Sequence, residues 1–261
     1  SSNDMKPSLE TKQKSSIKYG DIFQIGDHIL ACGDAHDTTI VDRAIGKRIV
    51  SLVEADPPYG VLYAESKAGF SKLKVDRKIL NDDIVSESQY AQFTKDWITP
   101  IIPHLARKNS FYIFNSDKMV FAIRDGMEHS GVKFAQLLIW VKHHVVIGRK
   151  DYLPMHELIA YGWSGTHAFR KAKDKSVLFC PKPSKSALHP TQKPVSLLRR
   201  LILNSTAIGE VVYDCFAGSG STGIACEQTK RKCVMIEFDP EYCQTILDRF
   251  EKTFGIKANR L

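Results

Sequence analysis

Four consecutive residues, Asp56-Pro57-Pro58-Tyr59, combine a carboxylate, a rigid turn and an aromatic ring. The two prolines fix the turn and remove two backbone N–H donors, which leaves carbonyl oxygens pointing outward. A carboxylate and such carbonyls accept hydrogen bonds from an amino group, and the tyrosine ring offers a flat face for stacking. The tetrapeptide therefore suits a planar ring that carries an amino group, although a rigid surface turn with a helix-capping aspartate explains the same residues.

A second constellation near the C-terminus is rich in glycine. Gly218, Gly220 and Gly223 have a G-x-G-x-x-G spacing between an apolar strand and a helix, and Glu237 ends the next expected strand. Glycines let a backbone approach a ligand, a helix N-terminus offers free N–H groups, and the acid accepts hydrogen bonds from ribose hydroxyls. Phe216, in the turn, either packs on the ligand or fills the core. The unit indicates a nucleotide-type site.

The position of this glycine loop disfavours an NAD-binding domain. Only 24 residues follow Glu237, so a dinucleotide domain that began here would lack the rest of its sheet. The remaining strands must therefore lie N-terminal to the loop, and we expect the sheet to be used in permuted order.

The elements that must position both constellations alternate between strands and helices. Strands are predicted over 21–34 (broken by a turn at Gly26-Asp27), 49–55, 111–115, 134–142 and 156–163, and helices over 38–46, 87–105, 120–131, 195–205 and 240–254. Residues 210–242 predict strand, glycine loop, helix and strand in succession. Pro100 and Pro103 are expected to interrupt the helix that contains them. The pattern predicts an α/β fold with a Rossmann-like, doubly wound, mostly parallel sheet in permuted order and an antiparallel pair at one edge.

Length and composition limit the classes of protein to consider. The chain has 261 residues, of which 43% are hydrophobic and 25% charged, as in an ordinary globular domain. We expect a flexible tail over 1–18, a single domain over 19–261 and a mobile loop over 60–83. The six cysteines form no C-x-x-C pair, so no metal site is expected and a reduced cytosol fits best. The chain shows neither a signal peptide nor an apolar run long enough to cross a bilayer, which predicts a cytoplasmic protein without a membrane partner.

The excess of basic residues is concentrated in one segment. The chain carries 37 Lys and Arg against 29 Asp and Glu, a net charge of +8. Residues 142–193 contain ten of the basic residues and three of the acidic ones, which amounts to +7 of the +8. A solvated loop is one explanation, but this concentration favours a polyanionic partner.

Three separated motifs in consistent order resemble one family. DPPY (56–59) precedes HPTQKP (189–194), which precedes FAGSGSTG (216–223). This order resembles that of the β-type, permuted S-adenosylmethionine-dependent amino DNA methyltransferases of the DPPY/FxGxG kind. GDHILACGD, ILNDD and the LLIWVK…GRKDY…HE stretch add to the resemblance, which spans roughly residues 19–254 and looks closest to the phage and prophage branch.

The resemblance implies a binding site for S-adenosylmethionine. Its contacts would come from Asp34, Ala35, Asp56, His189, Thr191, Lys193, Phe216, Gly218, Ser219, Gly220, Ser221, Thr222, Glu237 and Phe238. The glycine loop would cradle the methionine and ribose, Glu237 would bind the ribose hydroxyls, and Asp34 the adenine amino group. Thr191 and Lys193 would lie near the amino-acid end, where Lys193 would meet the carboxylate. As alternatives to a role at the cofactor, Lys193 would contact a DNA phosphate and His189 would be a turn residue.

The same resemblance implies methylation of an exocyclic amino group. Such a nitrogen is a poor nucleophile because its lone pair is delocalised into the ring. Asp56 and the Pro57 carbonyl would accept its two N–H bonds, with Pro58 and Tyr59 completing the catalytic corner, so that the lone pair points at the sulfonium methyl. No covalent intermediate is needed, and the Pro-Cys pair typical of ring-carbon methyltransferases does not occur in the chain.

A base inside a duplex must be flipped out before it can react, and Tyr59 is the first candidate to stack on it. The loop over 60–83 could close over the site, and Trp140, Tyr152 and His156 either line the base pocket or pack in the core. The basic segment would hold the double-stranded DNA, with contacts from Lys142, His143, Arg149, Lys150, Tyr152, His156, Arg170, Lys171 and Lys173.

The sequence thus predicts a DNA methyltransferase for the adenine amino group, because DPPY is more usual there and SPPY in cytosine enzymes. Cytosine N4 methylation and an inactive DNA-binding protein with a retained cofactor fold are the alternatives. A homodimer, a cognate restriction nuclease and association with the nucleoid are further hypotheses.

Overall fold

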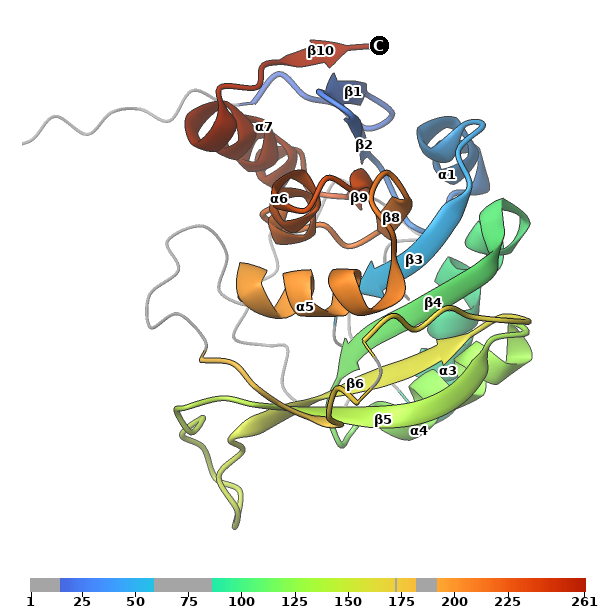
Figure 1. The fold of residues 1–261 in the computed structure, drawn as a ribbon, viewed down its shortest axis with the longest axis vertical. Helices are drawn as coiled ribbons and strands as arrows, with labels where there is room; N and C mark the ends of the chain where they lie inside the picture. The colour runs from blue at the N-terminus through green and yellow to red at the C-terminus, as the bar shows by residue number, and fades with distance from the viewer. Residues whose placement is uncertain (1–14, 59–85, 172, 182–191) are drawn as a thin grey trace, which may run out of the picture.

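The computed structural model describes residues 15–58, 86–171, 173–181 and 192–261 (Figure 1). Its strands are β1 (Ile22–Ile25), β2 (His28–Cys32), β3 (Val50–Ala55), β4 (Leu105–Asn115), β5 (Lys133–Val141), β6 (His156–Trp163), β7 (Val177–Phe179), β8 (Val211–Asp214), β9 (Lys232–Glu237) and β10 (Ala258–Arg260). Its helices are α1 (Thr38–Ile45), α3 (Glu87–Ile98), the 3₁₀ helix η3 (Thr99–His104), α4 (Val120–His129), α5 (Val195–Ser205), α6 (Ser221–Gln228) and α7 (Pro240–Phe254).

The strands form one ten-stranded sheet in the order β10-β1-β2-β9-β8-β3-β4-β6-β5-β7. The five strands from β2 to β4 in this order pair in parallel. β1 and β10 add antiparallel pairs at one side, and β6 runs antiparallel to β4 and β5 at the other. The structure confirms the predicted doubly wound, mostly parallel sheet in permuted order. The expected antiparallel pair, β5 and β6, is present, but it is not outermost because β7 pairs with β5 in parallel.

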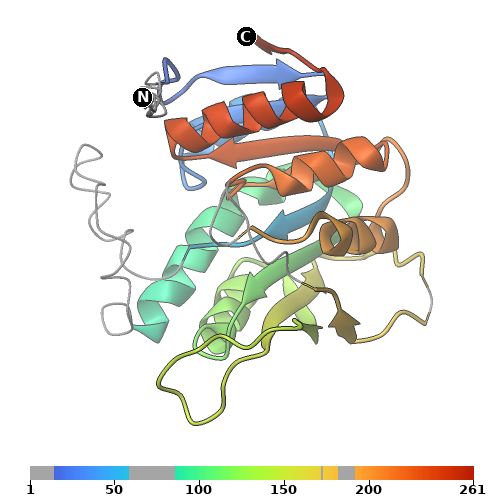
Figure 2. The same cartoon turned by 90° about the vertical axis from the view of Figure 1, so that its left-hand side faces the viewer.

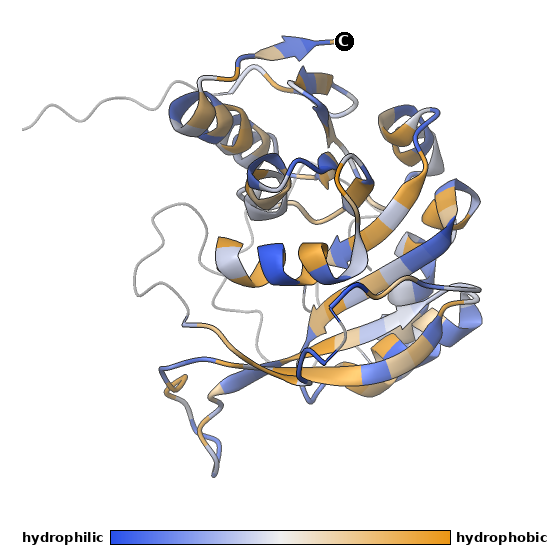
Figure 3. Cartoon of the chain, in the orientation of Figure 1, coloured by the Kyte–Doolittle hydropathy of each residue, from blue (hydrophilic) through white to orange (hydrophobic). Residues whose placement is uncertain are grey.

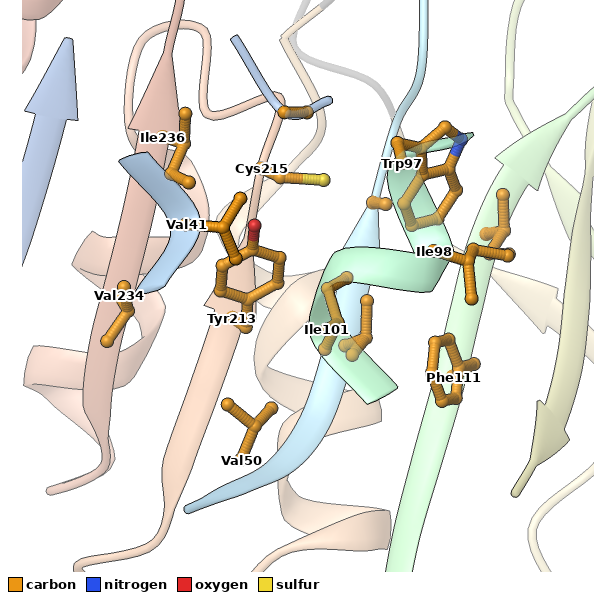
Figure 4. Close-up of a cluster of buried hydrophobic side chains, with 14 of the residues drawn as sticks. Val41, Val50, Trp97, Ile98, Ile101, Phe111, Tyr213, Cys215, Val234 and Ile236 are labelled. Atoms are coloured by element: carbon orange, nitrogen blue, oxygen red, sulfur yellow. The ribbon is translucent and has the colours of Figure 1, made fainter. Parts of the chain in front are cut away.

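Two apolar clusters make this sheet the middle of three layers. One cluster joins α1, α3 and α4 to one face of the sheet, and the other joins α5, α6 and α7 to the opposite face. Figure 4 shows the first cluster, where Val41 lies beside Tyr213 of the central strand β8 and Ile98 lies beside Phe111 of β4. Figure 3 shows that β3 is apolar over most of its course, and all six of its residues are buried, as in a strand covered on both faces.

Local residues set where the helices begin and end. Asp37 caps α1 by accepting hydrogen bonds from the first turn, and Gly46 ends that helix at φ 61°. Pro100 and Pro103 end the regular helix α3 and leave the 3₁₀ turn η3, as expected. Packing begins earlier than the predicted end of the tail at residue 18, because Ile17 is buried in the second cluster.

All six cysteines are free and buried. Across the described ranges, no group of three or more His, Cys, Asp or Glu residues could hold a metal ion. In the same ranges no helix combines the length and the apolar composition that crossing a bilayer requires.

Candidate active site

The parallel strands bring the predicted site residues to one edge of the sheet. Asp34 follows β2, Glu237 ends β9, Asp214 ends β8 and Asp56 follows β3. Because these strands are parallel, their carboxyl ends face the same side of the sheet, which lies to the left in Figure 2. Ligands of open α/β sheets bind at this edge. The fold therefore collects four carboxyl groups that are far apart in the sequence.

The glycine loop joins β8 to α6 in a conformation that its residue types dictate. Gly218 and Gly220 have φ values of 56° and 82°, in the left-handed region that favours glycine. Asp214 spans the loop by accepting hydrogen bonds from the Phe216 N–H (3.1 Å) and the Thr222 hydroxyl (2.7 Å). Burial raises the pKa of Asp214 to about 7. Thr222, predicted to touch the cofactor, is buried, and its hydroxyl shapes the loop instead.

Glu237 lies directly beside this loop. Its two carboxyl oxygens accept hydrogen bonds from the N–H groups of Gly218 (2.9 Å) and Asp239 (2.7 Å). Burial raises the pKa of Glu237 to about 7, although both hydrogen bonds act to lower it. Each carboxyl oxygen has a second lone pair, so the pair of oxygens still suits two ribose hydroxyls.

The neighbouring residue Asp34 is held by a histidine. Its Oδ1 accepts hydrogen bonds from both the backbone N–H (2.9 Å) and the Nδ1 (2.8 Å) of His36. Burial acts to raise the pKa of Asp34, but these hydrogen bonds outweigh it and hold that pKa below its usual value. Asp34 is therefore an anionic acceptor at the edge where the adenine amino group is expected. Ala35 next to it is buried, and Phe238 contacts Tyr19 edge to face.

Phe216 is half-buried and rests on the first cluster. Its ring stacks on Phe93, with centroids 6.1 Å apart, and meets the edge of Trp97 at 5.4 Å. The ring therefore closes the core on one side, as the packing interpretation expects. Its partial exposure at the carboxyl edge is what the cofactor interpretation requires.

The buried Lys193 is the centre of a chain of charged side chains. Its Nζ lies 3.2 Å from Asp56 Oδ2 and 2.9 Å from Glu157 Oε1, and the second Glu157 oxygen lies 3.2 Å from Lys142 Nζ. The Lys193 side chain is only 7% exposed. Burial acts to lower the pKa of Lys193, but the charges of Asp56 and Glu157 raise it above the usual value. Both partners in the structure are carboxylates of the chain itself, and the contact with a cofactor carboxylate stays a prediction.

Two consecutive residues connect the glycine loop to the Asp-Pro-Pro turn. The Ser219 hydroxyl donates to Gln192 Oε1 (3.1 Å), and the next residue, Lys193, pairs with Asp56. The charge of Asp56 also contributes to the raised pKa of Asp214 at the start of the loop. These contacts link the two constellations through Gln192 and Lys193.

The rest of the carboxylate turn is only partly described. Pro57 is buried, and the exposed Pro58 accepts a hydrogen bond from the Tyr90 hydroxyl through its carbonyl (3.1 Å). Tyr59, His189 and Thr191 lie outside the described residues, as do the expected loop over 60–83 and the ILNDD stretch.

The structure divides the predicted basic segment between two edges of the sheet. The loop between β5 and β6 (residues 142–155) leaves the sheet at the carboxyl edge, because β5 runs in the same direction as β4. It carries His143, Arg149, Lys150 and Tyr152, all exposed, and ends at the exposed His156. We define it as the β5–β6 loop.

Arg170, Lys171 and Lys173 belong to the opposite edge. β6 returns toward the amino end of β4, where Thr166 bridges Lys108. Arg170 is fixed near the end of α5 by a hydrogen bond to the Asn204 carbonyl. The reversal of the chain at β6 therefore separates the two halves of the segment 142–193, and the predicted DNA contact of each half stays a prediction.

Two predicted residues have mainly internal contacts. Trp140 is fully buried and donates from Nε1 to the Cys180 carbonyl (2.7 Å), so it packs in the core and does not line a base pocket. Lys142, predicted to contact DNA, is largely buried beside Trp140 and paired with Glu157.

Sequence reasoning missed three residues of this edge. Glu157, of the HE pair at residues 156–157, has no role in the predicted site, although it is one of three acids in the basic segment. Arg249 of α7 supports the glycine loop from behind, donating to the Ser219 carbonyl (3.1 Å) and the Ser221 hydroxyl (2.9 Å). Glu54 is buried beside Asp214, and burial raises its pKa well above the usual value. The sequence offers one indication of Glu54, because it is an acid within the largely apolar run 49–55.

This combination defines a class. The features of an S-adenosylmethionine-dependent methyltransferase are a doubly wound sheet, a glycine loop and an acid on adjacent strands, and a carboxylate-proline turn on the next strand. The model of the family described as DNA methylase (N6_N4_Mtase) matches residues 50–248. The chain belongs to this DNA methylase family.

Relatives agree with this assignment over most of their length. The chain is 24% identical over 258 residues to the Type II methyltransferase M.HpaI of Haemophilus parainfluenzae, covering 88% of this chain and 76% of the relative. It is 25% identical over 222 residues to M2.DpnII of Streptococcus pneumoniae, covering 77% and 82%.

Solved structures share the fold. The M1.HpyAVI–SAM complex has a TM-score of 0.62 and 25% identity, covering 84% of this chain and 98% of that one. The cytosine-N4-specific PvuII DNA methyltransferase has a TM-score of 0.69 at 17% identity, covering 89% and 90%. The protein is a DNA amino methyltransferase that uses S-adenosylmethionine.

Proposed function

We propose that this chain methylates the exocyclic N6 of adenine in double-stranded DNA after flipping the base out of the helix. The observation that carries the proposal is the position of Asp56, a partly exposed carboxylate linked through Lys193 and Gln192 to the glycine loop. An acceptor at that place can hold an amino group against the cofactor site. The alternative acceptor is the N4 amino group of cytosine.

The residues present fit S-adenosylmethionine. Glu237 accepts two N–H bonds and keeps lone pairs for ribose hydroxyls, and Asp34 is an anionic acceptor two strands away from the glycine loop. Ser219 and Ser221, predicted to contact the cofactor, are buried in the loop and are held by Arg249. The cofactor supplies a methyl group on a positively charged sulfur.

Positioning is the main contribution of the protein. In our mechanism the Asp56 carboxylate and the Pro57 carbonyl accept the two N–H bonds of the amino group, which localises the nitrogen lone pair for an in-line displacement. Two fixed acceptors also stabilise the positive charge that develops on the nitrogen. Lys193 fixes the carboxylate in place, and Tyr90 fixes the carbonyl of the adjacent Pro58.

The β5–β6 loop is the proposed DNA contact at this edge. Its arginine and lysine at positions 149 and 150 are exposed and suit phosphates, and the Tyr152 side chain is 91% exposed. Ile147, 89% exposed in the same loop, adds an apolar group at its tip. Tyr59 is the proposed stacking partner of the flipped base.

Replacement of Asp56 by alanine tests the proposal. We expect Asp56→Ala to lower the single-turnover transfer rate by about 10³-fold, because one preorganised group is lost, while the dissociation constant of S-adenosylmethionine changes little. Asp248→Ala, at an exposed position of α7, is the control. Turnover equal to that of the wild type would reject the assigned role.

Mass analysis of nucleosides distinguishes the two acceptors. DNA incubated with the enzyme and cofactor should yield N6-methyladenine, and N4-methylcytosine would instead establish the alternative. DNA that is bound but carries no methyl group would indicate an inactive DNA-binding protein.

Two partners accompany this proposal. A cognate restriction nuclease fits because the named relatives are Type II methyltransferases. If it exists, DNA methylated by this chain should resist that nuclease. A homodimer is tested by the mass of the protein in solution with and without DNA. A cytoplasmic, nucleoid-associated location follows from the DNA substrate and is tested by microscopy of a fluorescent fusion.

A further inference from the structure

The chain of charges at the site continues beyond the residues that the proposed reaction uses. Glu157 lies between two lysines, with its oxygens 2.9 Å from Lys193 Nζ and 3.2 Å from Lys142 Nζ. It is the second residue of β6 and pairs in register with Trp140 of β5. The carboxylate therefore sits where the two strands that carry the β5–β6 loop leave the sheet.

Two aromatic rings also lie close to Lys193. Its Nζ lies 5.4 Å from the ring centroid of Phe114 and 5.6 Å from that of Trp140. Aromatic faces attract a cation but do not fix its direction, whereas a short ion pair does. The ammonium position is thus set by Asp56 on one side and Glu157 on the other.

We propose that Glu157 is a positioning residue for methyl transfer, which acts on Asp56 through Lys193. Glu157 holds the ammonium between the two carboxylates, so that Asp56 is oriented by Lys193 without being drawn fully into an ion pair with it. The inference rests on the proposed function, since it concerns the carboxylate that accepts the amino group.

The consequence of removing the Glu157 charge follows from the count of charges. In the wild type, two ammonium groups face two carboxylates in one chain of contacts. With glutamine at position 157, Asp56 is the carboxylate of this chain that still pairs with Lys193. Lys193 then moves toward Asp56, because a buried ammonium group without a nearby carboxylate is unfavourable. The Asp56 oxygens lose alignment with the amino group, and a misplacement of about 1 Å costs about 10²-fold in rate.

Glu157→Gln tests the inference because it keeps the size of the side chain and an oxygen acceptor. We expect the single-turnover transfer rate to fall by about 10²-fold. The dissociation constants of S-adenosylmethionine and of DNA should stay within about threefold, since the glycine loop and the β5–β6 loop keep their own contacts. Glu157→Asp, which restores the charge on a shorter side chain, should recover part of the rate. Glu128→Gln, at an exposed pair on α4, is the matched control.

Each outcome separates this inference from the proposed function. If the wild type transfers no methyl group to DNA, the proposed function fails and the inference fails with it. If the wild type is active and Glu157→Gln has an unchanged rate, only the inference is refuted. A loss of rate accompanied by equal losses in both affinities and in melting temperature would assign Glu157 a purely structural role and would also refute it.

Discussion

The pH dependence of cofactor binding follows from the position of Glu237. Burial raises the pKa of this carboxyl to about 7, so the group is mostly neutral at pH 6 and mostly ionised at pH 8. Only the ionised form offers all its lone pairs to ribose hydroxyls in addition to the two N–H groups it already accepts. Binding should therefore strengthen as pH rises through about 7.

The magnitude comes from the ionised fraction. With a pKa of about 7, roughly one tenth of the carboxyl groups are ionised at pH 6 and roughly nine tenths at pH 8. If binding requires the anion, the dissociation constant of S-adenosylmethionine should fall about tenfold over this interval. Calorimetry of the wild type and of Glu237→Gln at each pH measures this dissociation constant. Any change in the protonation of the ligand itself affects both proteins equally.

Glu237→Gln should bind more weakly than the wild type at pH 8 and should lack the extra tenfold dependence. Glu241→Gln, at the exposed start of α7, should behave like the wild type. If Glu237→Gln keeps the full dependence, the titrating group is another one, such as Asp214, and the role given to Glu237 is refuted.

Two further predictions concern packing and DNA. A methyl group at Gly223 would lie 2.7 Å from the buried Met235 sulfur and 3.1 Å from Phe250. Gly223→Ala should therefore lower the free energy of unfolding, measured by denaturant titration, by about 1–2 kcal/mol. An unchanged free energy of unfolding would contradict the close packing. Arg149→Gln should lower the slope of log K for DNA binding against log salt concentration by about 1, the loss of one phosphate contact. Arg170→Gln, at the opposite edge, should leave this slope unchanged. Equal effects of the two substitutions would contradict the division of the basic segment.

Long elements could be predicted from the sequence because their residues are periodic or continuous. The run that forms β3 is apolar except at Ser51 and Glu54, and the prolines after Ile98 mark the end of α3. β7 and β10 have three residues each, too few for any alternation to be recognised. Such short strands form because a neighbouring strand already offers hydrogen bonds, and this depends on the tertiary structure.

The candidate site was predictable where a residue ends a strand of known direction. Asp56 and the glycine loop were expected to meet for that reason, and contacts through Gln192 and Lys193 link them. The partners of Lys193 could not be predicted, because Glu157 reaches it through the pairing of β6 with β4 and β5. The net charge of a segment likewise does not say at which edge of the sheet each basic residue lies, so the separation of Arg170 from the β5–β6 loop could not be predicted.

Lys142 directly follows β5, and Glu157 is the second residue of β6. Their ion pair therefore joins the two ends of the β5–β6 loop at its base. A loop closed at its base can change in length and sequence without altering the strands beneath it. Relatives could thus diverge in the DNA sequence they recognise through this loop while inheriting the same chemistry at Asp56.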